Sequence, residues 1–206
     1  MKSSPLITCP SIRQDNNKII YFDYNSTTPT DARVLECMLP FYLDKFGNAS
    51  SNTHTYGWES NLAVKKARKF IAEFLNGNTD NLIFTSGATE SNNLVFHAVS
   101  QALKNHGNHI ITSSIEHKCV LSCCKQLEKQ GFDITYIQPD AHGFIQPEHI
   151  KSAIRPHTIL ISIMAANNEI GTIQPIESIG KIASEHKILF HSDAAQLIGK
   201  IDFKIN

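Results

Sequence analysis

The sequence predicts an α/β fold in which a mainly parallel sheet carries helices on both faces. Short apolar runs of β type alternate along the chain with longer runs whose apolar residues recur every three or four positions. The connections between them are short and rich in Gly, Pro and Asn, as at 139–143. This alternation favours parallel strands, because a crossover helix brings the chain back to the same edge of the sheet.

Each element is predicted from one of these runs. Strands are expected at the apolar runs Ile19–Phe22, Leu82–Thr85, His109–Thr112, Ile134–Ile137, Ile159–Met164 and Ile188–His191. Helices are expected at the periodic runs Asp31–Phe46, Trp58–Leu75, Glu90–Asn105, Lys118–Gln130, Pro147–Ile154 and Pro175–His186. No internal repeat or low-complexity linker divides the chain, so residues 19–206 are interpreted as one domain and residues 1–18 as a loose N-terminal extension.

The segment Gly87–Asn93 has the character of an anion site. It lies between a predicted strand and a predicted helix. Backbone N–H groups at a helix N-terminus have no intrahelical partner and carry the positive end of the helix dipole, so a phosphate can approach Ala88 and Thr89 closely. The hydroxyls of Ser86 and Thr89 can add hydrogen bonds. The segment alone is equally consistent with an ordinary turn followed by an N-cap.

Three further polar segments follow apolar strand-type runs. They contain His117, Asn168, and the pair Asp193 and Gln196. Ligands of open parallel sheets bind outside the carboxyl ends of the strands, so these side chains are expected to converge on one ligand. Each also has a local alternative: His117 and Asp193 as helix caps, and Asn168 with its neighbour as a simple turn.

Together these segments resemble the cysteine desulfurases, within the class V aminotransferase group of enzymes that use pyridoxal 5′-phosphate (PLP). The resemblance implies the large domain of a type I PLP-dependent transferase. It runs in order from about residue 19 to the last residue. The segments that carry it are Tyr21–Pro29, Phe46–Asn48, Phe84–Ser91, Glu116–Lys118, Asn167–Gly171 and Asp193–Gln196.

The resemblance implies a role for each matching residue. Ala88 and Thr89 match the positions that hold the cofactor phosphate by backbone N–H and hydroxyl. His117 matches the imidazole that stacks on the pyridine ring and shuttles protons, and it is the candidate catalytic residue.

Three further residues match positions around the ring. Asn168 and Gln196 match amides beside the phenolic oxygen of the ring, and Asp193 matches the carboxylate that pairs with the ring nitrogen. A carboxylate there keeps the nitrogen protonated, which makes the ring an electron sink.

The resemblance also implies an activity and partners. L-Cysteine is expected as substrate, with L-alanine and an enzyme persulfide as products, for iron–sulfur cluster or thio-cofactor assembly. A sulfur-acceptor protein and, in a complete enzyme, a homodimer are implied as well.

Family members continue into a Ser-x-His-Lys segment, whose Lys binds PLP covalently, and then to a persulfide-forming Cys and a small domain. We therefore expect residues 19–206 to be a PLP-binding large domain truncated at its C-terminal side and inactive alone. The alternative is a remnant, or one half of a split enzyme, that binds PLP weakly or pairs with an intact homologue. The local match Ser184–Lys187 is expected at the N-terminal edge of a strand, away from the ligand crevice.

Composition excludes several other classes of protein. The 206 residues include 19 basic and 19 acidic side chains without a basic patch, which argues against a nucleic-acid partner. The longest apolar run, 159–166, is far shorter than the ~20 residues that cross a bilayer, so no membrane partner is expected. The five cysteines fit no disulfide framework, which favours a reducing, cytoplasmic location. Cys119, Cys123 and Cys124 are interpreted as helix thiols, and no metal is expected.

Overall fold

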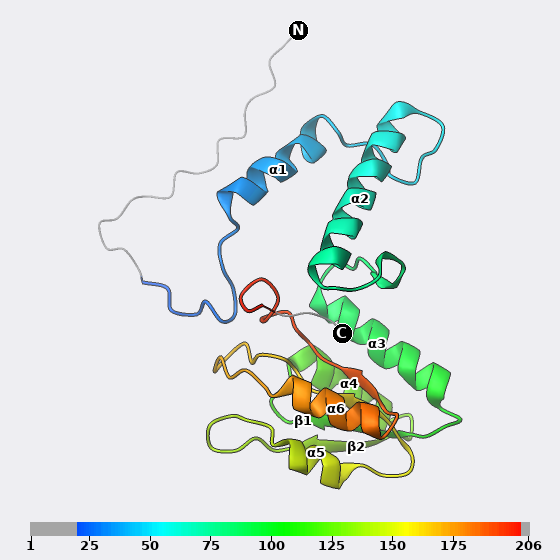
Figure 1. Cartoon of the computed structure of the whole chain (residues 1–206), viewed down its shortest axis with the longest axis vertical. Helices are drawn as coiled ribbons and strands as arrows, with labels where there is room; N and C mark the ends of the chain where they lie inside the picture. Colours follow the sequence, from blue (N-terminus) through cyan, green and yellow to red (C-terminus); the bar gives the residue numbers. More distant parts are fainter. Residues whose placement is uncertain (1–19, 203–206) are drawn as a thin grey trace.

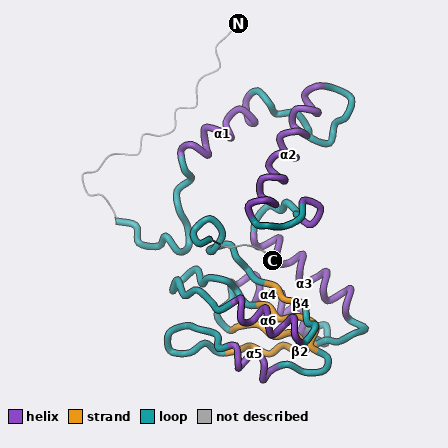
Figure 2. The backbone as a smooth tube through the Cα atoms, in the orientation of Figure 1, coloured by secondary structure: helices purple, strands orange, loops and turns teal. Residues whose placement is uncertain are grey.

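The computed structural model describes residues 20–202, and the predicted extension at 1–18 lies outside them. Its centre is a four-stranded sheet in the order β2-β1-β3-β4, with every neighbouring pair parallel. The strands are β1 (His109–Ser113), β2 (Asp133–Ile137), β3 (Thr158–Ser162) and β4 (Leu189–His191). Figure 2 shows them as a single layer between helices. The predicted parallel α/β fold is confirmed.

The helices lie close to their predicted ranges. They are α1 (Ala32–Leu43), α2 (Thr55–Phe74), α3 (Ala88–Leu103), α4 (Lys118–Glu128), α5 (Pro147–Ala153) and α6 (Ile176–Glu185), with a short 3-10 helix, η1, at Thr79–Asn81. Helix α2 begins three residues before its predicted start at Trp58, because the His54 ring accepts a hydrogen bond from the Gly57 N–H and caps the helix there.

Neighbouring residues of β1 face opposite layers of helices. Ile111 packs in a buried cluster with Ile150 of α5 and Ile179 of α6, whereas Ile110 packs with Phe96 of α3 and residues of α4. Side chains alternate across a strand, and all five residues of β1 are buried, so this central strand buries both of its faces. Helices therefore cover both faces of the sheet, as predicted (Figure 1).

His109 adds a polar link across the middle of the sheet. Its ring is fully buried, with Nδ1 2.7 Å from the Thr158 hydroxyl and Nε2 2.9 Å from the Thr135 hydroxyl. The ring thus joins β1 to both of its neighbours. Burial lowers the pKa of His109 to about 4, and the positive charge of Arg155 adds to this effect.

Two of the predicted strands are wrong. The described part of the first, 20–22, is in no strand, and its side chains are exposed, with Phe22 at 88%. Leu82–Thr85 is also outside any strand, although Leu82 itself is extended. Apolar composition made these segments look like strands, but a strand needs a hydrogen-bonded neighbour, and neither segment pairs with another strand among residues 20–202.

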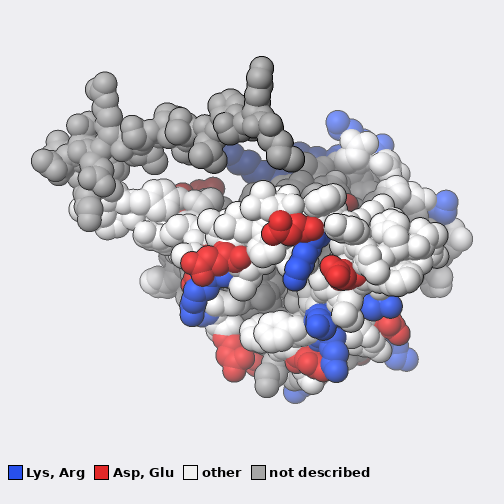
Figure 3. All heavy atoms as spheres, turned by 90° about the horizontal axis from the view of Figure 1, so that it is seen from above, with Lys and Arg blue, Asp and Glu red and all other residues white. Residues whose placement is uncertain are grey.

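The helices α1 and α2 stand apart from the sheet and its covering helices (Figure 1). Within the described range no side chain of α1 is buried. On the face drawn in Figure 3, basic and acidic side chains are intermixed. No helix among residues 20–202 combines the length and apolar character needed to cross a membrane.

Candidate cofactor site

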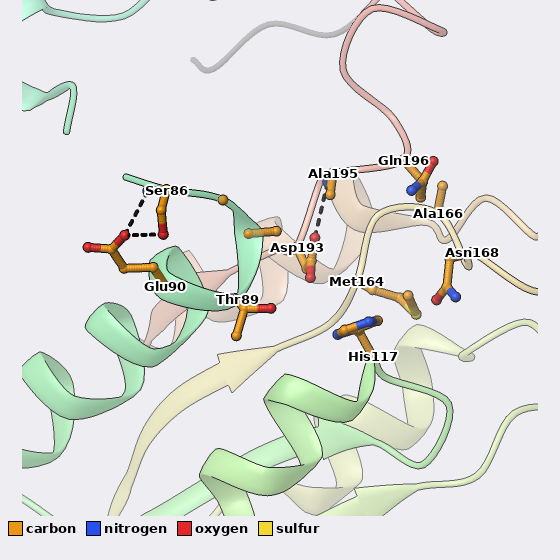
Figure 4. A pocket seen from close by; sticks show the side chains of 12 residues that line it. Ser86, Thr89, Glu90, His117, Met164, Ala166, Asn168, Asp193, Ala195 and Gln196 are labelled. Atoms are coloured by element: carbon orange, nitrogen blue, oxygen red, sulfur yellow. Dashed lines mark hydrogen bonds between the residues drawn. The ribbon is translucent and has the colours of Figure 1, made fainter. Parts of the chain in front are cut away.

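All six predicted site residues line one cavity of about 310 Å³. It lies beyond the carboxyl ends of β1, β3 and β4, because His117 follows β1, Asn168 follows β3 and Asp193 follows β4. Figure 4 shows Thr89 at the N-terminus of α3 and His117, Asn168 and Gln196 on the other side of the cavity. The full lining consists of Ser86, Gly87, Ala88, Thr89, Glu90, His117, Met164, Ala166, Asn168, Asp193, Ala195 and Gln196.

The N-terminus of α3 forms one wall of the cavity. No described side chain caps this helix, so its first backbone N–H groups are free to meet a ligand. A Cβ added at Gly87 would meet no atom within 4 Å, so the space before the helix is open. The Ser86 hydroxyl, expected to help bind an anion, is instead 2.6 Å from a carboxylate oxygen of Glu90, which also accepts from the Ser86 N–H. The expectation for Ser86 is therefore corrected.

His117 combines its predicted local role with a place at the cavity. Its Nδ1 accepts a hydrogen bond from the Cys119 N–H and so caps α4, and the same atom lies 2.9 Å from the Cys119 sulfur. Capping fixes the ring close to the end of β1. The capping alternative from the sequence is correct, and the ring still lines the cavity (Figure 4).

The two neighbouring asparagines, Asn167 and Asn168, have different roles in the loop after β3. Asn167 is buried; its Oδ1 accepts from the N–H groups of Glu169 and Ile170, and its Nδ2 donates to the Ile115 carbonyl. It therefore forms the predicted turn and joins the loop after β3 to the loop after β1. Asn168 is free of that task and lines the cavity.

Asp193 is held from both sides of its carboxylate. Oδ1 accepts from the Ala195 N–H at 3.0 Å, but residues 195–197 form a turn and no helix begins there, so the alternative of a helix cap at Asp193 is wrong. Oδ2 accepts from Nδ2 of Asn92 at 2.7 Å. Its backbone carbonyl accepts from the Ala165 N–H at 2.8 Å, which extends the pairing of β3 and β4 beyond the strands.

Gln196 borders the cavity, and both polar atoms of its amide bond residues outside the cavity. Its Nε2 donates to the Ser26 carbonyl at 3.1 Å, and its Oε1 accepts from the Lys200 ammonium at 2.6 Å. These contacts attach the segment before α1 to the segment after β4.

A buried carboxyl group lies under the site. Glu116 is 5% exposed; its Oε1 accepts from the Ser113 hydroxyl at 2.6 Å and from the Met164 N–H at 2.9 Å. Its Oε2 finds no partner among the described residues. Burial raises the pKa of Glu116 to about 7; the two hydrogen bonds oppose this shift, and the negative charge of Asp193 adds to it.

Sequence reasoning missed both Asn92 and Glu116. Asn92 lies four residues after Ala88, so the helical repeat already placed it on the same face as the anion site. Glu116 directly precedes His117, but no pattern in the sequence signalled its burial.

Lys187, the lysine of the local Ser-x-His-Lys match, lies where it was expected. Lys187 connects α6 to β4 and so stands at the N-terminal end of that strand, opposite the cavity. Its φ of 56° is in the left-handed region, which suits the tight turn between the two elements. Among residues 20–202, no group of three His, Cys, Asp or Glu side chains is arranged to hold a metal ion.

The residues around the cavity fit PLP. An uncapped helix N-terminus suits the phosphate, and a fixed carboxylate suits a protonated ring nitrogen. An imidazole and two amides complete a set of groups that can contact the ring and its oxygen. Fold and cavity together define a domain of the PLP-dependent transferase class.

Comparison with known proteins narrows this class. The family described as Aminotransferase class-V matches residues 20–206, and the chain belongs to this family. It is 51% identical over 187 residues to the mitochondrial cysteine desulfurase of Saccharomyces cerevisiae, covering 91% of this chain and 38% of that protein. It is also 51% identical over 187 residues to the cysteine desulfurase IscS of Rickettsia typhi, with coverages of 91% and 46%. The chain thus spans less than half the length of these relatives.

Solved structures agree with this assignment. The protein titled "SspA in complex with cysteine" is 47% identical and superimposes with a TM-score of 0.85, covering 89% of this chain and 53% of the other. A NifS-like protein is 43% identical with a TM-score of 0.86, and the coverages are 90% and 51%.

Proposed function

We propose that this chain supplies the PLP-binding half of a cysteine desulfurase. The complete enzyme would remove sulfur from L-cysteine, giving L-alanine and an enzyme persulfide that a sulfur-acceptor protein receives for iron–sulfur cluster or thio-cofactor assembly. The observation that carries the proposal is the cavity, where residues from three strand ends meet an uncapped helix N-terminus. The relatives named above are cysteine desulfurases.

Each of the six predicted site residues has a proposed task. The N–H groups of Ala88 and Thr89, with the Thr89 hydroxyl, would bind the phosphate, and Asp193 would hold a proton on the ring nitrogen. His117 would lie against the ring and move a proton to or from the substrate, whereas Asn168 and Gln196 would orient the phenolic oxygen. When bound, PLP supplies the electron sink that stabilises negative charge on the substrate α-carbon.

The cofactor part of the proposal is tested by equilibrium dialysis of PLP against the purified chain. Replacing Asp193 with Ala removes a charged partner, so we expect PLP binding to weaken about 10- to 100-fold. The matched control is Asp80→Ala, an exposed carboxylate in η1, which should leave the affinity unchanged. Equal affinity of Asp193→Ala and the unaltered chain would contradict the assignment.

The enzymatic part is tested by complementation. The alternative function is a chain that binds PLP weakly or pairs with an intact homologue without turnover. The purified chain is mixed with a C-terminal fragment of the Rickettsia typhi relative, and sulfide release from L-cysteine is measured. Release that needs both pieces, and that is lost with His117→Ala, supports the desulfurase half. No release with PLP still bound supports the alternative.

A further inference from the structure

Asn92 makes a contact that joins two distant parts of the site. It lies on α3, is 2% exposed, and donates from Nδ2 to Oδ2 of Asp193 at 2.7 Å. The same nitrogen lies 3.2 Å from the sulfur of Cys119 on α4. An amide NH₂ group has two protons and a carboxylate only accepts, so both protons of Asn92 are used and its orientation is fixed.

The contact completes the support of the Asp193 carboxylate. The Ala195 N–H holds Oδ1 at 3.0 Å, and this local bond alone leaves the second oxygen free to rotate away. Asn92 fixes that second oxygen. A carboxylate held at both oxygens keeps one orientation, which a partner on the ring nitrogen requires.

The position of Asn92 also links the two ends of the site. It lies one helical turn after Ala88, on the helix whose N-terminus forms the anion site. The ring nitrogen and the phosphate of PLP are joined by a rigid ring, so their protein partners must keep a fixed separation. Resting on the function proposed above, we infer that Asn92 is a positioning residue that sets the Asp193 carboxylate at a fixed place relative to the phosphate-binding end of α3.

A purely structural role for Asn92 gives different results from a positioning role. If Asn92 only packs α3 against α4, its loss weakens every ligand of the cavity equally. If it acts through Asp193, its loss weakens only ligands that have a ring nitrogen. The test therefore compares PLP with its 1-deaza analogue, in which a C–H group replaces that nitrogen.

The variants are Asn92→Ala and Asn92→Asp, with Asn108→Ala as the matched control. Asn108 donates one side-chain hydrogen bond to the Gly131 carbonyl, near the opposite end of β1. We expect Asn92→Ala to weaken PLP binding about 10-fold and the deaza analogue less than about 2-fold. Asn92→Asp keeps the shape but places a second carboxylate against Asp193, so its loss of PLP binding should be larger. Equal losses for both ligands would overturn the inference.

A second measurement needs no cofactor. Melting temperatures are compared for Asn92→Ala, Asp193→Ala and the double variant. Because the two side chains share one bond, the double variant should lose clearly less than the sum of the two single losses. Additive losses would overturn the inference even if PLP binds. Failure of the unaltered chain to bind PLP would instead overturn the proposed function, and the melting data would still decide whether Asn92 holds Asp193.

Discussion

The ammonium nitrogen of Lys200 lies 2.6 Å from Oε1 of Gln196, so a lysine contacts a residue that lines the cavity. Lys187, the lysine of the local Ser-x-His-Lys match, lies instead between α6 and β4. The Lys200 ammonium donates to Gln196 and, at 3.4 Å, to the Tyr24 carbonyl, so two of its three protons have partners within the chain.

We therefore predict that this chain binds PLP without a covalent bond. PLP should leave completely on dialysis, and treatment with borohydride should modify no lysine stoichiometrically. Peptide mapping by mass spectrometry measures this, with Lys200→Met and Lys187→Ala as controls. A stoichiometric adduct at Lys200 would show that it can leave Gln196 and reach the cofactor. One at Lys187 would overturn the placement of that residue opposite the cavity.

The second prediction concerns Glu116, whose pKa is raised by burial to about 7 from an ordinary value of 4.5. Between these values the folded state holds a proton that the unfolded state releases. Its contribution to stability is therefore complete below pH 4.5 and is lost as the pH rises through 7. One proton gives a slope of at most about 1.4 kcal/mol per pH unit.

Urea unfolding of the unaltered chain and of Glu116→Gln measures this contribution. The difference between the two free energies of unfolding should favour the unaltered chain progressively less between pH 4.5 and 7. Burial lowers the pKa values of His109 and His191, so their contributions are lost as the pH falls. The comparison isolates Glu116 because both proteins keep these histidines. Parallel curves would show that Glu116 does not titrate in this range.

The fold was predictable from sequence wherever the pattern within one segment was enough to identify it as a strand or a helix. Strands β1 and β3 contain the short apolar runs 110–111 and 159–161, and both lie in the centre of the sheet. Leu82–Thr85 has similar composition but pairs with no strand among residues 20–202. Its apolar run could not reveal this, because pairing depends on neighbours distant in sequence.

The site was likewise predictable only where the sequence order of the strands was enough to place a residue. His117, Asn168 and Asp193 were found because strand ends of a parallel sheet converge. The bond from Asn92 to Asp193 joins residues 101 positions apart, and no local pattern specifies which face of a helix meets a given carboxylate. The burial of Glu116 likewise depends on its tertiary neighbours.

The third prediction compares the core of the sheet with its edge. Ile161 of β3 is fully buried between strands and helices, whereas Leu189 of β4 is 50% exposed at the edge of the sheet. Ile161→Ala should lower the free energy of unfolding by about 2 to 5 kcal/mol through lost packing and a cavity. Leu189→Ala should cost less than about 1 kcal/mol. Urea titration of both variants tests this, and equal losses would contradict the packing described above.

The last prediction concerns α1, a helix of 12 residues with no buried side chain within the described range. An isolated helix of that length is only marginally stable in water, because most helical stability in proteins comes from a packed apolar face. The matched comparison is α4, which has 11 residues but buries Val120, Cys124 and Leu127. Hydrogen exchange at low protein concentration should be fast throughout α1 and slow in α4. Its exposed apolar residues, such as Leu35 and Leu39, also favour association, so protection of α1 should rise with concentration. Slow exchange in α1 at every concentration would show that it needs no covering surface.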